Sequence, residues 1–191
     1  MLICVTGVAG SGKSTVLGIL KRLKLNTFEM DKYVHQIYQR DDLGYKLIID
    51  HFGKKYVNEQ EVDRKTLGKL VFQDKKQLAK LNSVMIPIMQ NKLVELISLK
   101  NTYYVELAVY LNHEKQFKKY FKKIILIKAP KKLEKNNLKQ KFTHLNKFPT
   151  KNVGNLKNPI QINRIKYDFL LENNTDRKTL QKNVLKIVRK I

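Results

Sequence analysis

Short apolar runs and helix-like stripes of apolar residues alternate along this chain of 191 residues. The runs have the length and composition of buried strands and fall at 2–5, 26–30, 103–109, 123–127 and 169–173. The stripes repeat every three or four residues and predict helices at 13–24, 32–40, 43–51, 64–100, 131–142 and 175–191. Strands that alternate with helices favour a parallel sheet covered on both faces. The pattern therefore predicts an α/β fold with a doubly wound, five-stranded parallel sheet.

A glycine-rich loop directly follows the first apolar run. Its residues fill every fixed position of G-x-x-x-x-G-K-[ST] and are Gly7, Val8, Ala9, Gly10, Ser11, Gly12, Lys13 and Ser14, followed by Thr15. The glycines let successive backbone N–H groups surround an anion, because Cβ atoms would block so close an approach. We expect these residues to bind a nucleotide, with Lys13 on the terminal phosphates and the Ser14 hydroxyl on Mg²⁺. A glycine-rich turn that matches by chance is the alternative.

Two carboxylates are candidates because of their place at predicted strands. Asp31 follows the strand at 26–30, and the carboxyl ends of strands are where α/β folds bind ligands. Asp31 could also be a plain helix N-cap, and the two roles are compatible. Glu106 lies in an otherwise apolar or aromatic strand, where an unpaired charge would be costly. We expect Glu106 to point from the strand end toward Mg²⁺, water or substrate, with an exposed strand face as the alternative.

Two regions do not contribute strands. The stretch at about 32–100 is all helical and is predicted to form an insertion that binds the second substrate of a P-loop kinase, with Pro87 kinking or dividing its long helix. The region at about 131–164 loses its periodicity after a first helix and becomes rich in Lys, Asn, Gln and Thr. It is predicted to be a lid that excludes water from the transferred group, with a low-complexity loop as the alternative. The whole chain, 1–191, is expected to be a single P-loop kinase domain.

The net charge of +23 invites a nucleic-acid interpretation, because basic chains gain affinity for any polyphosphate. Lysine outnumbers arginine by 33 to 6, however, and Trp is absent. That composition indicates a biased genome rather than selection for bidentate phosphate contacts. We therefore expect no specific nucleic-acid partner, although the charge should attract small anionic substrates.

The remaining compositional features concern compartment and assembly. Cys4 is the only cysteine and lies in the first apolar run, so a buried thiol in a reducing compartment is expected. No charged leader with a cleavage site precedes the loop, and no apolar run approaches the roughly 18 residues of a membrane span. We expect a cytoplasmic protein without a membrane segment. A monomer is expected, and weak self-association stays open.

The chain resembles the dephospho-coenzyme A kinase family over nearly its whole length. Residues 6–15 match the family's T-G-x-x-G-S-G-K-S-T, and Glu29-Met30-Asp31 stands where its second strand ends D-A-D. The family order F-G, L-D-R, V-F-x-D and H-P is followed by Phe52-Gly53, Val62-Asp63-Arg64, Val71-Phe72-x-Asp74 and Pro87. Residues 167–173 resemble A-D-x-V-I-x-N, a segment associated with the adenine side of the nucleotide site.

This resemblance implies that ATP, with Mg²⁺, phosphorylates the ribose 3′-hydroxyl of dephospho-coenzyme A. It implies catalytic roles for Lys13 and Asp31, the latter orienting or deprotonating the attacking hydroxyl. It associates Asn173 with nucleotide binding. We also expect substrate binding by Arg64 and by Glu106, and the role of Glu106 is a hypothesis of its own, because the chain departs from the family motif there. Arg64 would bind the phosphates of the acceptor, and an ion pair with the neighbouring Asp63 is its alternative role.

The chain also departs from the family pattern. The family's D-x-P-L-L-x-E is Glu106 to Asn112 here, without the proline and the final acid, and His35 replaces an arginine. The lid offers Asn137 and Lys141 where arginines are expected. Lysine supplies charge without the planar fork that clamps phosphates. Lys141 could replace a lid arginine at the γ-phosphate, but a solvated helix face is the favoured interpretation. Two alternatives stay open: another nucleotide or nucleoside kinase of the P-loop class, and a basic nucleotide-binding protein without catalysis.

Overall fold

The computed structural model describes residues 1–134, 136, 165–174 and 176–191. Its strands are β1 (Leu2–Gly7), β2 (Asn26–Glu29), β3 (Tyr103–Glu106), β4 (Lys123–Lys128) and β5 (Phe169–Glu172). Its α-helices are α1 (Lys13–Arg22), α2 (Met30–Ile37), α3 (Leu43–Phe52), α4 (Arg64–Gln73), α5 (Lys75–Ser98), α6 (Glu114–Phe117) and α9 (Arg177–Val188). Short 3₁₀ helices are η1 (Lys54–Tyr56), η2 (Ala108–Asn112) and η3 (Lys118–Tyr120).

The described residues form two compact units. The sheet unit contains all five strands, from residues 1–29 together with the described residues from 93 onward. The helical unit contains residues 30–92. It covers most of the insertion predicted at about 32–100. The organisation of 1–191 as one kinase domain stays a prediction.

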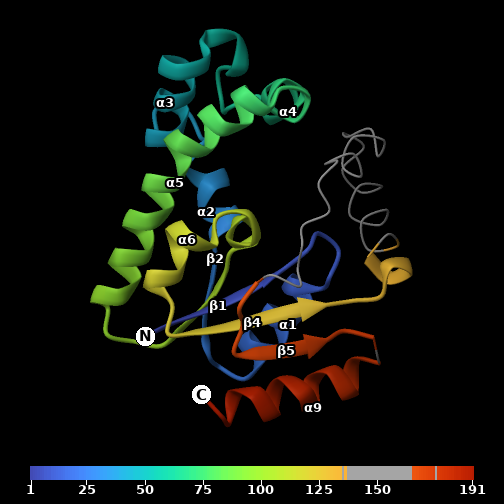
Figure 1. Ribbon diagram of the computed structural model, residues 1–191. Coiled ribbons are helices and arrows are strands. Elements are labelled where there is room, and N and C mark those ends of the chain that lie inside the picture. The colour runs from blue at the N-terminus through green and yellow to red at the C-terminus, as the bar shows by residue number, and fades with distance from the viewer. Residues whose placement is uncertain (135, 137–164, 175) are drawn as a thin grey trace. The chain divides into compact units, whose positions relative to one another are not determined.

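All strand pairs in the sheet unit are parallel, in the order β2-β3-β1-β4-β5. The register places Val5 of β1 beside Glu106 of β3 and Ile125 of β4. Parallel pairing brings the carboxyl ends of the strands to one edge, and Figure 1 shows β4 and β5 running in the same direction. The predicted five-stranded parallel sheet is confirmed.

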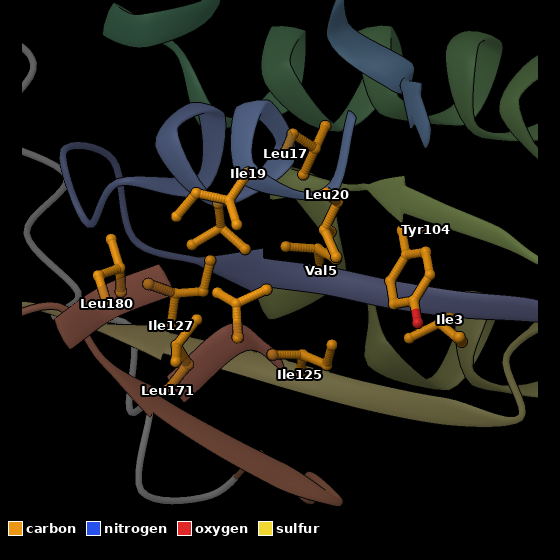
Figure 2. Packing of buried hydrophobic residues seen from close by; sticks show 12 residues of the cluster. Ile3, Val5, Leu17, Ile19, Leu20, Tyr104, Ile125, Ile127, Leu171 and Leu180 are labelled. Atoms are coloured by element: carbon orange, nitrogen blue, oxygen red, sulfur yellow. The ribbon is translucent and has the colours of Figure 1, made fainter. Parts of the chain in front are cut away.

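The sheet is covered on both faces, as expected for a doubly wound fold. One face packs against α1 and α9 through a cluster of Ile3, Val5, Val16, Leu17, Ile19, Leu20, Tyr104, Ile125, Ile127, Leu171, Leu180 and Val184 (Figure 2). Leu2 and Cys4 alternate with Ile3 and Val5, so they lie on the opposite face, and both are buried. There η2 packs beside β1, and the Tyr110 ring is fully buried. Each fully buried aliphatic side chain contributes about 2 kcal/mol relative to an exposed one.

Several predicted boundaries are corrected by the structure. The strand predicted at 103–109 ends at Glu106, because the chain turns into η2 at Ala108. The strand predicted at 26–30 ends at Glu29, and α2 begins at Met30. The helical stretch at 64–100 divides at Asp74, whose carboxylate accepts hydrogen bonds from the next backbone amides, while α5 continues through Pro87. Of the two effects predicted for Pro87, division of the helix is therefore wrong, and a kink stays a prediction.

Other predicted elements are confirmed in part. Residues 131–134 and 136 are helical, whereas the remainder of the helix predicted at 131–142 and nearly all of the predicted lid lie outside the described residues. The sequence pattern missed α6, η2 and η3, which are too short to show a period. Of the helices that the structure describes, none combines the length and apolarity that crossing a membrane requires.

Helix α4 of the helical unit begins at a strong N-cap. The Asp63 carboxylate accepts hydrogen bonds from the Lys65 N–H at 3.0 Å and the Thr66 N–H at 3.1 Å, and also from the Thr66 hydroxyl. The side-chain and backbone hydrogen bonds from Thr66 lower the pKa of Asp63 below its ordinary 3.8. Asp42, at the N-cap of α3, makes no such side-chain bond.

Replacing Asp63 by alanine is expected to lower the free energy of unfolding by about 1 kcal/mol at neutral pH. Asp42→Ala is the matched control and should change it by less than about 0.5 kcal/mol. Because folding lowers the pKa of Asp63, its contribution is present above the ordinary value and fades as the pH falls through the lowered one. Urea denaturation at pH 7 and pH 3 measures both effects. Equal losses in the two variants at pH 7 would contradict the assigned cap.

Candidate nucleotide-binding site

The P-loop connects the end of β1 to the start of α1. The Ser11 N–H donates to the Val8 carbonyl at 3.1 Å, which closes a tight turn. Gly10 and Gly12 have φ angles of 82° and 96°, in the left-handed region that favours glycine. The first turn of α1 carries no acidic residue, so its positive end is left for an anion. Ser14 and Thr15 are exposed on that turn, as the expected roles of the Ser14 hydroxyl require.

The loop backbone is closely packed by other parts of the sheet unit. A Cβ atom on Gly7 would lie 2.5 Å from the Ile127 carbonyl oxygen, and one on Gly10 would lie 2.4 Å from the Glu134 carbonyl oxygen. A Cβ on Gly12 would lie 2.2 Å from the Asn173 side-chain nitrogen. Ile127 lies near the end of β4, Glu134 follows β4, and Asn173 follows β5. The glycines are therefore required by the protein's own packing as well as by phosphate.

Lys13 folds back over the loop. Its Nζ donates to the Gly7 carbonyl at 3.0 Å and to the Val8 carbonyl at 3.2 Å. The same atom lies 3.8 Å from Oε1 of Glu106, and each of the two residues is only 9 % exposed. At an effective dielectric of about 20, charges this far apart attract by about 4 kcal/mol, before the cost of removing both from water. The pair therefore compensates two charges that burial alone would disfavour.

Glu106 is the last residue of β3 and faces the P-loop lysine. The alternative that it lies on an exposed strand face is wrong, because it is buried and ion-paired. Its negative charge also acts on Cys4, whose pKa is raised well above its usual value, first by complete burial and then by Glu106. The thiol of Cys4 is thus buried and unreactive, as the sequence predicted. The role of Glu106 in binding substrate or metal stays a prediction.

Asn173 lies directly after β5 and contacts the P-loop. Its Nδ2 donates to the Ser11 carbonyl at 2.9 Å, and its own N–H donates to the Lys128 carbonyl at 2.7 Å. The side chain is buried. The resemblance associates this segment with adenine, whereas the structure gives the Asn173 amide a partner in the loop itself.

The structure adds contacts, or their absence, for two polar groups of the matched motif. The Thr6 hydroxyl donates to the Leu107 carbonyl at 2.9 Å and fixes the start of the loop against the chain that leaves β3. The Ser11 hydroxyl is buried without a hydrogen-bond partner among the described residues. Thr6 stands in the matched motif, but only the structure shows its partner, which is distant in sequence.

Asp31 and Arg64 belong to the helical unit and are both exposed. Asp31 is the second residue of α2, so the alternative that it is the N-cap of this helix is wrong. It follows Glu29, the last residue of β2, by two positions, and Glu29 pairs with Glu106 in the sheet register. The structure therefore brings together the P-loop, Glu106 and Asn173, and it describes Asp31 and Arg64 in their own unit.

The alternative that Arg64 forms an ion pair with Asp63 is wrong. Among the residues that the structure describes, Asp63 is bonded to Thr66 and Lys65 at the N-cap of α4, and no ion pair joins it to Arg64. The positive charge of Arg64 acts on Tyr38 instead. Burial raises the pKa of Tyr38 to about 12, and Arg64 partly opposes that rise. The Arg64 guanidinium is thus exposed at the start of α4.

The packing around Gly12 predicts opposite effects at two glycines. Gly12→Ala should lower the free energy of unfolding by roughly 2 kcal/mol, because its φ of 96° is strained for alanine and its Cβ meets Asn173. Gly18 lies inside α1, and an added Cβ there would have no neighbouring atom within 4 Å. Gly18→Ala should therefore raise the free energy of unfolding by about 0.5–1 kcal/mol. Urea denaturation of both variants tests this. Stabilisation by Gly12→Ala would rule out the packing described for the loop.

Comparison with known proteins adds independent findings on this chain. The model of the dephospho-CoA kinase family matches residues 1–179. The dephospho-CoA kinase of Mycoplasma genitalium is 36% identical over 150 residues, covering 75% of this chain and 74% of the relative. That of Mycoplasma pneumoniae is 35% identical over 142 residues, covering 73% and 71%.

Solved structures agree on the fold. TT1252 from Thermus thermophilus superposes with a TM-score of 0.77 at 23% identity, covering 100% of this chain and 96% of that one. Dephospho-CoA kinase from Campylobacter jejuni gives a TM-score of 0.65 at 23% identity, covering 99% and 96%. The sheet, the P-loop and the match of the family model over residues 1–179 lead to one assignment: this chain belongs to the dephospho-CoA kinase family.

Proposed function

We propose that this chain transfers the γ-phosphoryl group of ATP to the ribose 3′-hydroxyl of dephospho-coenzyme A, the last step of coenzyme A synthesis. The observation that carries the proposal is a complete P-loop, with a buried lysine at the carboxyl edge of a parallel sheet, in a member of this family. Phosphoryl transfer needs positioning and charge neutralisation more than covalent chemistry. The described site contains backbone N–H groups that could position the phosphates and a lysine that could neutralise their charge.

On the donor side, the backbone N–H groups of the loop and the start of α1 would bind the phosphates of ATP. Lys13 now contacts two loop carbonyls and Glu106. We propose that its ammonium contacts the β- and γ-phosphates in the complex and stabilises the charge that develops in the transition state. The loop carbonyls hold the lysine side chain folded back over the loop, so little conformational entropy remains to be lost on binding.

The residues at the loop fit a magnesium ion that accompanies ATP. Mg²⁺ prefers oxygen ligands and takes only one or two from the protein, with phosphates and waters completing its shell. The exposed Ser14 hydroxyl and the Glu106 carboxylate are such donors. The described part of the chain contains no cluster of three or more His, Cys, Asp or Glu, and this kind of site requires none. When bound, the ion neutralises negative charge on the β- and γ-phosphates.

On the acceptor side, we propose roles for Asp31 and Arg64. The carboxylate of Asp31 would accept a hydrogen bond from the 3′-hydroxyl and then its proton. Covalent geometry keeps its Cα within about 7.6 Å of the Cα of Glu29, at the end of β2. The exposed guanidinium of Arg64 would bind phosphates of the acceptor bidentately.

The fold alone does not select the acceptor. Shikimate kinase from Aquifex aeolicus has a TM-score of 0.53 at 16% identity, and deoxyadenosine kinase from M. mycoides has 0.56 at 17%. Likeness at such identities concerns the fold only. Family membership therefore favours dephospho-coenzyme A over nucleoside and nucleotide acceptors, and a catalytic protein over a nucleotide-binding protein without activity.

The purified protein with Mg-ATP is expected to convert dephospho-coenzyme A to coenzyme A. A coupled assay of ADP formation, with the product identified by mass, measures the conversion. Nucleoside monophosphates and deoxyadenosine serve as competing acceptors, and kcat/KM should favour dephospho-coenzyme A by at least about 100-fold. Binding of ATP without turnover of dephospho-coenzyme A would overturn the proposed function.

Asp31→Asn is expected to lower kcat by about 100-fold or more while the dissociation constant of ATP changes less than about threefold, because the amide cannot accept a proton. Asp42→Asn, an exposed acid of the same unit, is the matched control and should retain activity. Single-turnover kinetics and ATP titration separate chemistry from binding. Wild-type turnover in Asp31→Asn would remove Asp31 from the mechanism.

A further inference from the structure

We infer that Asn173 is a positioning residue whose side-chain amide orients the Ser11–Gly12 peptide so that the Gly12 N–H faces the bound triphosphate. The inference rests on the proposed function only in that the P-loop binds the phosphates of ATP. It assigns Asn173 to the phosphate end of the nucleotide rather than to its base. Three features of the sheet unit support it.

The first feature is the way in which Asn173 is held. Its backbone N–H donates to the Lys128 carbonyl at the end of β4, at 2.7 Å. Its Nδ2 donates to the Ser11 carbonyl at 2.9 Å, and the residue is only 8 % exposed. A buried amide that is fixed at its backbone has little freedom to turn away from the loop. Asn173 thus ties the end of β4 to the P-loop.

The second feature is the fit between Asn173 and Gly12. A Cβ atom on Gly12 would lie 2.2 Å from the Asn173 Nδ2 and 3.2 Å from its Cγ. The side-chain amide therefore occupies the space that any other residue at position 12 would fill. The φ angle of 96° at Gly12 is also one that glycine adopts without strain. Gly12 and Asn173 form a matched pair at the end of the loop.

The third feature follows from the geometry of the peptide unit. The Ser11–Gly12 peptide is trans, so its C=O and N–H groups point in opposite directions. The carbonyl points at Asn173. The Gly12 N–H must therefore point away from Asn173, and that side is where we place the phosphate. By fixing the direction of the Ser11 carbonyl, Asn173 also fixes the direction of the Gly12 N–H. Asn173 itself would not contact the ligand.

The competing role is a contact between Asn173 and adenine. That role requires the side chain to reach the base, whereas Nδ2 already donates to the loop and the side chain is buried. The two roles differ in which part of ATP they serve. A ligand with the phosphates and no base distinguishes them.

The test compares inorganic tripolyphosphate with ATP, each with Mg²⁺, by isothermal titration calorimetry. Asn173→Asp keeps the shape of the side chain but replaces the donor with an oxygen that faces the Ser11 carbonyl. We expect the dissociation constants of both ligands to rise by about 10-fold or more, and by the same factor. Asn174→Asp, which introduces the same charge at the exposed neighbouring residue, should stay within about threefold of wild type.

Each other outcome has a defined meaning. If ATP bound more weakly while tripolyphosphate binding stayed unchanged, the inference would be overturned in favour of a base contact. If Asn174→Asp weakened binding as much as Asn173→Asp, the inference would also be overturned, because the added negative charge alone would explain the loss. Asn173→Ala removes the donor without adding charge and should weaken both ligands equally while unfolding stays cooperative. Failure of both Asn173 variants to fold would also overturn the inference, because Asn173 would then maintain the whole sheet.

The assay requires no turnover, so it separates this inference from the proposed function. A wild-type protein that binds tripolyphosphate but does not phosphorylate dephospho-coenzyme A would refute the function and leave Asn173 testable. A wild-type protein that binds neither tripolyphosphate nor ATP would overturn both.

Discussion

The close approach of the P-loop backbone to the segments around it is the constraint on which the rest of the site depends. Added Cβ atoms at Gly7, Gly10 and Gly12 would lie 2.2–2.5 Å from atoms of three other segments. Those segments are all more than 100 residues from the loop in sequence, and the parallel sheet brings them to the same edge as the loop. In the assembled sheet, these three loop positions therefore leave no room for a side chain. The phosphate site is a product of the assembled sheet as much as of the motif.

The second requirement is compensation of buried charge. Lys13 and Glu106 are each largely removed from water, and their attraction, together with the hydrogen bonds from Lys13 to loop carbonyls, offsets that cost. A buried pair of this kind contributes little net stability, because desolvation takes back most of the Coulomb gain. The pair instead keeps the ammonium at the loop, where the proposed function places the phosphates of ATP. The net charge of +23 adds a long-range field that favours the approach of anionic substrates.

The sequence predicted what local patterns determine. The P-loop motif, the succession of strands along the chain and the buried thiol of Cys4 could all be predicted from residues that are neighbours in the sequence. The end of β3 was missed because Ala108 and Val109 are apolar and extend the strand pattern, although the chain turns there. The helix break at Asp74 was missed because apolar residues continue at helical spacing on both sides of it. The Asn173–Ser11 bond joins residues 162 positions apart, and no pattern in one sequence specifies such a partner. The roles of Asp31 and Arg64 likewise depend on substrate geometry that a sequence does not contain.

Because the chain departs from the family pattern, we expect the P-loop to supply a larger part of the charge neutralisation. Asn137 and Lys141 stand where the family has lid arginines, and neither supplies a planar fork for phosphate oxygens. If the predicted lid neutralises less charge for that reason, the proposed function requires a larger share from the backbone amides, Lys13 and the N-terminus of α1. Backbone donors stabilise a transition state only when they are aimed before the reaction begins, because reorientation during it would cost free energy. A side chain that fixes the direction of one peptide, as Asn173 does for Ser11–Gly12, then matters more than its single hydrogen bond would indicate.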